Sequence, residues 1–151
     1  MPEQGKYGTG LVFFPKDARI HSFLDIFNKI IKQEGLSLLG WRKVPVDNTT
    51  IGHVAREAEP EIWQPFIAQG ENPIDQEELE RRLYKVRKLV GKEIHYAGEA
   101  EYFVSFYICS LSTRTFCYKG QLMSNQLETY FLDLKDPEVE SALALVHSRY
   151  S

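Results

Sequence analysis

The stretch Tyr7–Trp41, YGTGLVFFPKDARIHSFLDIFNKIIKQEGLSLLGW, decides the fold of this 151-residue chain. It begins with an apolar run, Tyr7–Phe14, that predicts a β-strand. Apolar residues then recur every three or four positions, with Asp17 as the expected N-cap and Gly35 as the residue that ends the helix. A second apolar run, Leu36–Trp41, predicts another strand. The helix should therefore cover one face of a sheet, in which the two strands are either parallel neighbours or separated by a third.

Further strands and helices follow along the chain. The run Glu61–Ala68 predicts a strand, which Pro65 should confine to a sheet edge or a bulge because proline donates no main-chain hydrogen bond. Asp75, with a glutamate three residues later, has the form of a capping box and predicts a long helix. Tyr102–Ser110 is rich in aromatic and β-branched residues and predicts the strongest strand. Shorter elements are predicted as a helix at 51–58, a hairpin strand at 115–118, a helix at 121–130 and a helical turn at 136–140, with a polar connection at 93–101.

The last ten residues, Ala142–Ser151 (ALALVHSRYS), predict a strand that turns polar at its end. Side chains alternate between the two faces of a strand, so Leu143, Leu145, His147 and Arg149 should share one face. A strand that starts in a core and ends in an imidazole and a guanidinium can deliver both groups to a pocket. The alternative is an edge strand with a solvated end.

Length and composition favour one α+β domain, or part of one, over residues 1–151. Apolar residues make up 43% of the chain, and the net charge of −3 argues against a nucleic-acid or anionic-membrane surface. No apolar run is long enough to span a bilayer, and no signal peptide is visible. Two cysteines, Cys109 and Cys117, have no metal-ligand spacing and predict reduced thiols in a cytoplasmic protein.

Few residues outside the closing strand indicate chemistry, and no phosphate-binding loop or metal motif occurs. Cys109 lies within an aromatic run, which favours a small buried residue over a nucleophile. Trp41 and Arg42 could clamp an anion, but a strand end with a snorkelling arginine is the more economical interpretation. A basic group on the second helix fits either an anion-binding patch or, more simply, a solvated helix face; its members are Arg81, Arg82, Lys85, Arg87 and Lys88.

Four stretches together carry a resemblance to a known family. They are Leu39–Pro45 (LGWRKVP), Phe106–Ser112 (FYICSLS), Tyr118–Gly120 (YKG) and Glu140–Ser151 (ESALALVHSRYS). In this order they resemble an internal part of the N-terminal glutamine amidotransferase domain of the glutamate synthase large chain, a class II domain of the N-terminal-nucleophile hydrolase type. The resemblance implies part of a layered α-β-β-α sandwich with mixed or antiparallel sheets flanked by helices, incomplete at both ends of this chain.

The resemblance also implies an activity for the parent protein. In this family a catalytic cysteine attacks the side-chain amide of glutamine, which yields glutamate and ammonia. The ammonia then adds to 2-oxoglutarate in a synthase domain that carries flavin mononucleotide and an iron–sulfur cluster. This chain begins at Met1 and ends at Ser151, so we expect the nucleophile and the oxyanion-hole residues to lie outside it. The isolated chain should be inactive and should bind no cofactor and no metal.

One functional residue of the family falls inside the chain. Arg149 matches the arginine that grips the α-carboxylate of glutamine, and a guanidinium suits that role because it pairs with a carboxylate through two hydrogen bonds. His147, Tyr150 and Ser151 match flanking positions and are expected in the pocket wall. The implied partners are glutamine and the remainder of the parent chain, with no nucleic acid and no membrane. The alternative is a small amino-acid-binding or regulatory α+β module without catalysis.

Overall fold

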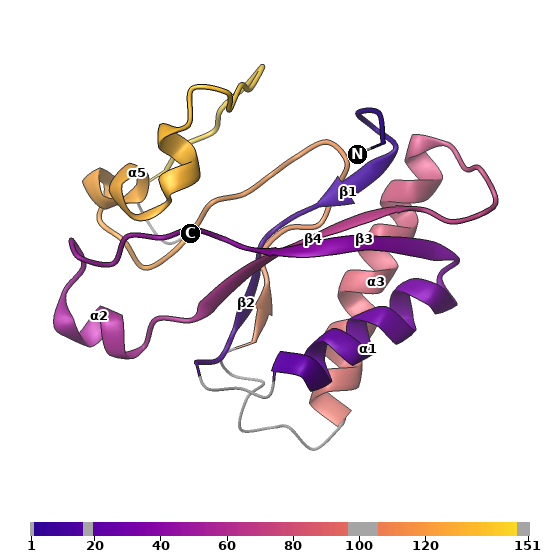
Figure 1. The fold of residues 1–151 in the computed structure, drawn as a ribbon, viewed down its shortest axis with the longest axis horizontal. Helices are drawn as coiled ribbons and strands as arrows, with labels where there is room; N and C mark the ends of the chain where they lie inside the picture. The colour runs from indigo at the N-terminus through magenta and orange to yellow at the C-terminus, as the bar shows by residue number, and fades with distance from the viewer. Residues whose placement is uncertain (1, 17–19, 97–105, 148–151) are drawn as a thin grey trace. The chain divides into compact units, whose positions relative to one another are not determined.

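The computed structural model describes residues 2–16, 20–96 and 106–147 of the chain. They fall into two compact units, one built from residues 1–43 and 60–117 and the other from residues 44–59 and 118–151. The first unit contains the sheet and the two long helices, and the second contains short helical segments (Figure 1). The chain is thus of mixed α+β class, and its sheet is antiparallel.

The sheet of the first unit has five strands, and β4 lies at its centre. Strand β3 pairs with one side of β4, and β1 and β2 pair with the other, all antiparallel. The short strand β5 extends the sheet beyond β2. The two strands predicted around the first helix are therefore separated by a third. The strands are β1 (Tyr7–Thr9), β2 (Val12–Phe14), β3 (Leu36–Lys43), β4 (Glu61–Gln69) and β5 (Tyr107–Ile108).

Pro65 does not confine β4 to an edge, so that part of the prediction is wrong, but the ladder between β3 and β4 has a register irregularity between Leu38 and Gly40, close to the Trp41–Pro65 pair. The strand predicted at Tyr7–Phe14 is instead divided into β1 and β2, and Pro65 lies opposite the gap. The pairs Thr9–Phe66 and Val12–Trp63 have the same register, so the gap interrupts the main-chain hydrogen bonds without shifting the alignment of the strands. Proline has no N–H to donate there, and the Thr9 hydroxyl donates to the Pro65 carbonyl at 2.8 Å. A central strand tolerates the proline because its neighbour is interrupted beside it.

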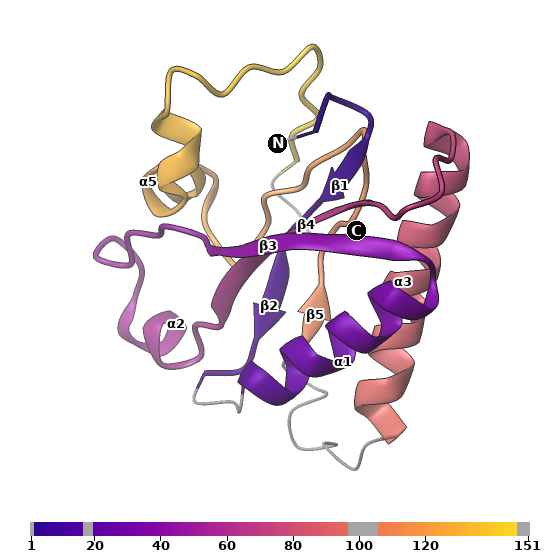
Figure 2. The same cartoon turned by 45° about the vertical axis from the view of Figure 1, so that its right-hand side comes forward.

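Two long helices, α1 (Ile20–Gln33) and α3 (Gln76–Tyr96), cover one face of the sheet (Figure 2). Both predicted helices are confirmed. Gly35 follows α1 with a φ of 68°, and Asp75 Oδ1 accepts the N–H of Glu78 at 2.7 Å at the start of α3. The connection predicted from residue 93 is wrong for 93–96, because Ile94 continues the buried stripe of α3 and is fully buried.

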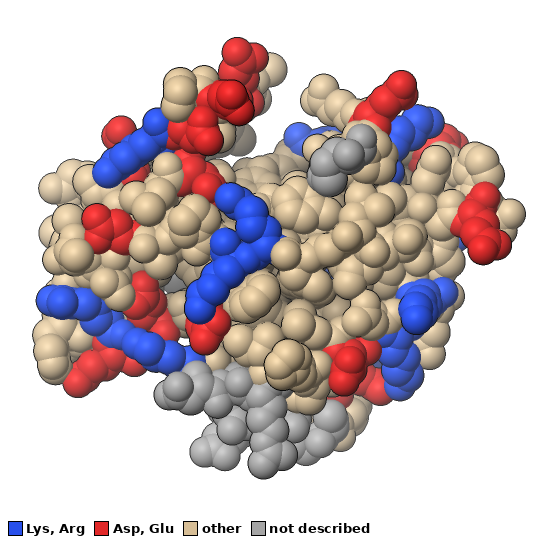
Figure 3. Space-filling view, in the orientation of Figure 1, with Lys and Arg blue, Asp and Glu red and all other residues tan. Residues whose placement is uncertain are grey.

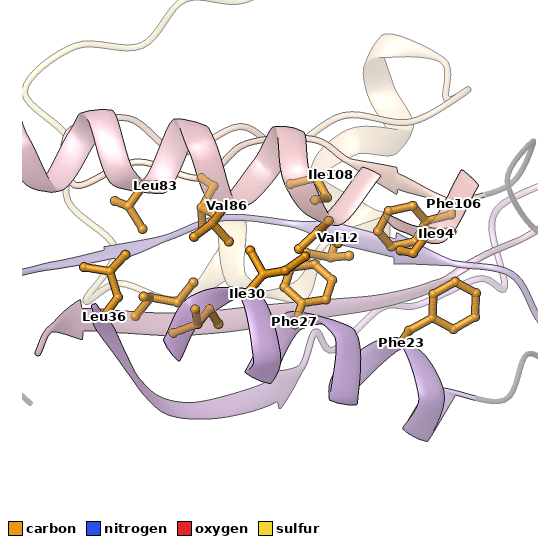
Figure 4. Packing of buried hydrophobic residues seen from close by; sticks show 14 of the residues in the cluster. Val12, Phe23, Phe27, Ile30, Leu36, Leu83, Val86, Ile94, Phe106 and Ile108 are labelled. Atoms are coloured by element: carbon orange, nitrogen blue, oxygen red, sulfur yellow. The ribbon is translucent and has the colours of Figure 1, made fainter. Parts of the chain in front are cut away.

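The core lies between these helices and the sheet. Figure 4 shows side chains from α1, α3 and the strands pointing toward one another in one continuous cluster. Phe14 from β2 contacts Phe23, Phe27 and Phe106, with ring centroids 5.6, 6.4 and 5.7 Å apart. Each such ring contributes about 1.5–3 kcal/mol when it is fully buried. The apolar periodicity of the helices is therefore satisfied by one aromatic-rich core.

In the described part of the second unit, short helical segments surround a β-bridge. Val46 pairs with Phe131, and the main-chain N–H of Asp47 donates to the carbonyl of Tyr130 at 2.8 Å. The short helix predicted at 51–58 is observed as α2, and the one predicted at 121–130 as η1 followed by α5. The segments are α2 (His53–Glu57), η1 (Ser124–Gln126), α5 (Leu127–Tyr130) and η2 (Leu132–Lys135).

Two local predictions are corrected by the structure, and a third is observed in a shorter form. The strand predicted at Tyr102–Ser110 is seen only at Tyr107–Ile108, and residues 102–105 lie outside the described part. Residues 115–118 form no hairpin strand, because the chain turns where Ser112 Oγ accepts the N–H groups of Arg114 and Thr115, at 3.0 and 3.3 Å. The helical turn predicted at 136–140 is observed as a single hydrogen-bonded turn, in which the Val139 N–H donates to the Asp136 carbonyl at 3.1 Å and Asp136 Oδ1 accepts the N–H of Glu138 at 2.9 Å.

The predicted closing strand is also corrected over residues 142–147. This part adopts no strand, and its side chains are exposed, with Leu143 at 75% and Leu145 at 90%. A strand exists only when its main chain pairs with a neighbour. Residues 142–147 take part in none of the sheet ladders of the described residues, so their alternating apolar side chains do not pack on a sheet. The prediction failed because apolar alternation shows that a segment could form a strand but does not identify a neighbouring strand for it to pair with.

Candidate functional site

Three of the four predicted site residues, Arg149, Tyr150 and Ser151, lie outside the described residues. His147 is described, and its side chain is exposed at the end of the irregular stretch that follows η2. Ser141 Oγ donates to the Leu143 carbonyl at 2.8 Å within that stretch. The predicted glutamine-binding wall therefore stays a prediction, and the residues that the structure does bring together lie elsewhere.

A hydrogen-bonded pair of a buried tyrosine and a half-buried carboxylate ties the second unit together. The Tyr130 hydroxyl donates to Glu59 Oε1 at 2.8 Å, and Asn48 Nδ2 donates to Glu59 Oε2 at 2.8 Å. Burial, together with the negative charge of Glu59, raises the pKa of Tyr130 above its usual value. Both carboxylate oxygens are occupied by neutral donors, so Glu59 serves to fix the chain around the Val46–Phe131 bridge.

A row of polar side chains crosses the sheet on the face turned away from the helices. Arg42 Nε donates to Gln64 Oε1 at 2.8 Å, and Gln64 Nε2 donates to Thr9 Oγ1 at 3.0 Å. Gln64 is buried, whereas Ile67, three positions along β4, faces the helices. Alternation along a strand therefore places Gln64 on the opposite face. Sequence analysis missed this row, because its members come from three strands and only pairing aligns them.

The structure decides how Trp41 and Arg42 are used. The Trp41 indole packs against the core rings of Phe14 and Phe27, with centroids 6.1 and 5.0 Å apart. Its Nε1–H is buried and has no hydrogen-bond partner among the described residues. Arg42 points to the opposite face, where it contacts Gln64. The two side chains thus leave β3 in opposite directions and do not clamp a common ligand.

The hydroxyl groups after β5 are committed to a carboxylate of α3. Ser112 Oγ donates to both oxygens of Glu80 at 3.0 and 3.1 Å, and Thr113 donates its hydroxyl to Glu80 Oε1 at 2.6 Å. Glu80 thereby fixes the turn at Ser112 and Thr113 against α3. Cys109 is buried, and its thiol donates to the Cys117 carbonyl at 3.5 Å. The prediction that Cys109 is a small buried residue is confirmed.

Carboxylates accompany the basic residues of α3. Arg82 and Arg81 donate to the two oxygens of Glu78, at 2.8 and 2.9 Å, and they hold the pKa of that carboxyl below its usual value. Arg82 also donates to the Glu34 carbonyl at the end of α1, at 3.0 Å. Figure 3 shows basic and acidic side chains interspersed over the face in view. These contacts favour the solvated-face interpretation over an anion-binding patch.

The described residues contain no group of three or more histidine, cysteine, aspartate or glutamate side chains placed to hold a metal ion. Within the same residues, every helix is too short or too polar to cross a membrane. These observations define no catalytic centre in this part of the chain.

Comparison with known proteins gives the family. A family model for class II glutamine amidotransferases matches residues 1–151. The NADH glutamate synthase of Schizosaccharomyces pombe is 40% identical over 157 residues, which cover 100% of this chain and 7% of that protein. The NADPH glutamate synthase large chain of Bacillus subtilis is 40% identical over 152 residues, covering 100% of this chain and 10% of its own length.

A ferredoxin-dependent glutamate synthase of Arabidopsis thaliana is 37% identical over 145 residues, which cover 95% of this chain and 9% of that protein. The chain thus spans a tenth or less of the length of these three relatives. The first two of these matches cover the whole chain and so include the four stretches of the resemblance described above. By the family model over its full length, the chain belongs to the class II glutamine amidotransferases.

Proposed function

We propose that this chain forms part of the glutaminase domain of a glutamate synthase. The observation that carries the proposal is the match along the whole chain, to one family model and to glutamate synthases of three electron-donor types. In the complete protein the domain would hydrolyse glutamine to glutamate and ammonia. The ammonia would then add to 2-oxoglutarate, and reduction of the resulting imine would give a second glutamate.

The sheet described above would be one half of a layered sandwich. Helices α1 and α3 cover one face, and the opposite face carries the row from Thr9 through Gln64 to Arg42. A second sheet packed against this face would give the α-β-β-α order that the family resemblance implies. Phe13 and Ile62, which are directly paired across β2 and β4, lie on this face and are buried, as expected of apolar residues between two layers, and this supports the proposal.

Arg149 would bind the α-carboxylate of glutamine in the assembled domain. Its guanidinium can donate two parallel hydrogen bonds and keeps its charge at any working pH. Holding the carboxylate at a fixed point would place the side-chain amide at a fixed distance from the nucleophile. His147, Tyr150 and Ser151 would form the surrounding pocket wall. The flavin mononucleotide and iron–sulfur cluster of the parent would lie in its synthase domain, where this chain would contact neither.

The test uses Arg149→Ala in the complete enzyme, assayed with glutamine and with free ammonia as nitrogen source. Loss of a bidentate carboxylate contact should lower kcat/KM for glutamine roughly a hundredfold or more, equivalent to about 3 kcal/mol. Ammonia-dependent synthesis should be largely retained, because it bypasses the glutaminase site. Arg81→Ala, at an exposed arginine of α3, is the matched control and should change neither assay. Equal loss with both nitrogen sources would refute the assignment of Arg149.

A second test uses the isolated 151-residue chain. We expect it to release no ammonia from glutamine, because the proposed nucleophile belongs to another part of the domain. Ammonia release at a rate comparable to that of the complete enzyme would contradict this. Binding of glutamine without release would instead favour the amino-acid-binding module. The cytoplasmic location stays a prediction, tested by fractionating cells that express the complete protein.

A further inference from the structure

The two cysteines, eight positions apart in sequence, lie against one another in the first unit. The Cys109 thiol is 3.5 Å from the carbonyl oxygen of Cys117. That oxygen is about 2.4 Å from the Cα of its own residue, so the Cys109 sulfur lies within about 6 Å of the Cys117 Cα. A disulfide requires Cα atoms about 4.4–6.8 Å apart, whereas this contact bounds only the distance from the Cys109 sulfur to the Cys117 Cα. Bond formation would therefore require rotation of the Cys117 side chain and movement of its main chain toward Cys109.

The surroundings of the two cysteines differ in a way that favours reaction of Cys117 before Cys109. Cys109 is buried beside β5, where its N–H donates to the Leu11 carbonyl at 2.8 Å. Cys117 is exposed, in a stretch after the Ser112 turn that has neither helix nor strand. One sulfur is thus held by the sheet and shielded from solvent, while the other meets solvent on an adaptable segment. An external oxidant would reach Cys117 first.

We propose that Cys109 and Cys117 form a reversible redox modification site, oxidised by a small disulfide such as oxidised glutathione. The Cys117 thiolate attacks one sulfur of that disulfide, which gives a mixed disulfide and releases one glutathione thiolate. The Cys109 thiol then loses its proton and attacks the Cys117 sulfur, which forms the internal disulfide and releases the second glutathione. Two protein thiols are oxidised, and one glutathione disulfide is reduced to two thiols. Excess thiol reverses both steps.

The internal disulfide would close a ring over residues 109–117 (the segment that follows β5 in Figure 2). The ring contains the turn at Ser112 and Thr113, which Glu80 already binds to α3. Oxidation would add a covalent restraint at the Cys117 end of this segment. Cys117 is also the last residue of the first unit, so the crosslink would hold the end of that unit to the residue that follows β5.

The test treats the full chain with oxidised glutathione at about pH 8, where a substantial fraction of an ordinary thiol is ionised. Samples are quenched in acid and mapped by mass spectrometry without reduction. The wild type should convert to a species with both cysteines linked and no glutathione attached. Cys109→Ser should instead retain glutathione on Cys117, at a level roughly tenfold or more above the wild type, because the positioned second thiol is missing.

Two further measurements keep the test decisive. Cys117→Ser should leave Cys109 largely unmodified in the folded chain and modified in denaturant, which would support the shielding of Cys109. A time course on the wild type alone should show the Cys117 adduct appear and then decay into the linked species, so the conclusion does not depend on a variant that folds. A wild-type adduct at Cys117 as persistent as that of Cys109→Ser would overturn the proposal, as would linkage only between separate chains.

Discussion

Replacing Gly10 with alanine tests how closely two parts of the sheet approach. Gly10 lies between β1 and β2, and the chain after β5 passes directly over it. A Cβ atom at this position would lie 1.7 Å from the carbonyl oxygen of Ser110 and 2.3 Å from its carbonyl carbon. Real Cβ contacts do not fall below 3.0 Å, so the two segments would have to separate by at least 1.3 Å, the difference between 3.0 and 1.7 Å. Main-chain atoms cannot relieve this by changing rotamer.

The magnitude follows from the hydrogen bonds beside the contact. Cys109 N–H donates to Leu11 at 2.8 Å, and Thr9 and Ser112 exchange two main-chain hydrogen bonds at 3.0 Å. A net contribution of about 0.5–1.5 kcal/mol for each of these bonds places the cost of separation at about 2–4 kcal/mol. The native stability of a domain is about 5–15 kcal/mol, so this loss is large.

Urea unfolding of the chain, followed by circular dichroism, measures the effect as a change in midpoint at constant slope. Gly91→Ala in α3 is the matched control, because nothing lies within 4 Å of its added Cβ. Alanine is favoured over glycine in a helix by up to about 1 kcal/mol, so the control should gain stability. Both substitutions replace glycine with alanine, but they should change the free energy of unfolding in opposite directions. A Gly10→Ala chain as stable as the wild type, or equal losses in both variants, would refute the close approach.

Two further predictions concern contacts outside the sheet. Arg82→Ala should lower the free energy of unfolding by about 1–2 kcal/mol, because Arg82 donates to the Glu34 carbonyl at the end of α1, whereas the exposed Arg81 does not; comparable urea midpoints for Arg82→Ala and Arg81→Ala would contradict this. The raised pKa of Tyr130, caused by burial and by Glu59, favours the protonated phenol in the folded state. This stabilisation should be complete below about pH 10 and lost as the pH rises further. Above about pH 10 the free energy of unfolding should therefore fall less steeply with pH in Tyr130→Phe than in the wild type. Equal slopes in the two proteins would contradict this prediction.

The long helices could be predicted because their signals are local. The stripe of α1, the glycine that ends it and the aspartate before α3 all lie within one or two turns of the residues they affect. Pairing between strands is not local. Trp63 of β4 meets Val12 and Lys43 on its two sides, and no short window of sequence contains both relations. Periodicity could therefore not predict that β4 lies at the centre of the sheet, and Pro65 favoured an edge position instead.

The candidate site divides in the same manner. Arg149 was predicted as a site residue from the resemblance of whole stretches to a family, since one arginine in an apolar run indicates little by itself. The Glu59–Tyr130 pair joins residues 71 positions apart, and the Gln64–Thr9 contact joins residues 55 apart. Neither has a motif, because a hydrogen bond between distant side chains leaves no spacing to recognise.

The proline at the centre of β4 has a consequence for the accuracy of folding. A sheet strand that slips by one residue exchanges its two faces, and uniform apolar runs such as 7–14 are prone to such errors. The missing N–H of Pro65 marks one position along β4, where the neighbouring chain needs no donor and Thr9 supplies a hydroxyl for the carbonyl. After a one-residue slip, a different residue would meet that position and Thr9 would no longer reach it. Pro65 thereby acts as a register mark, which penalises misaligned pairings more than the native one.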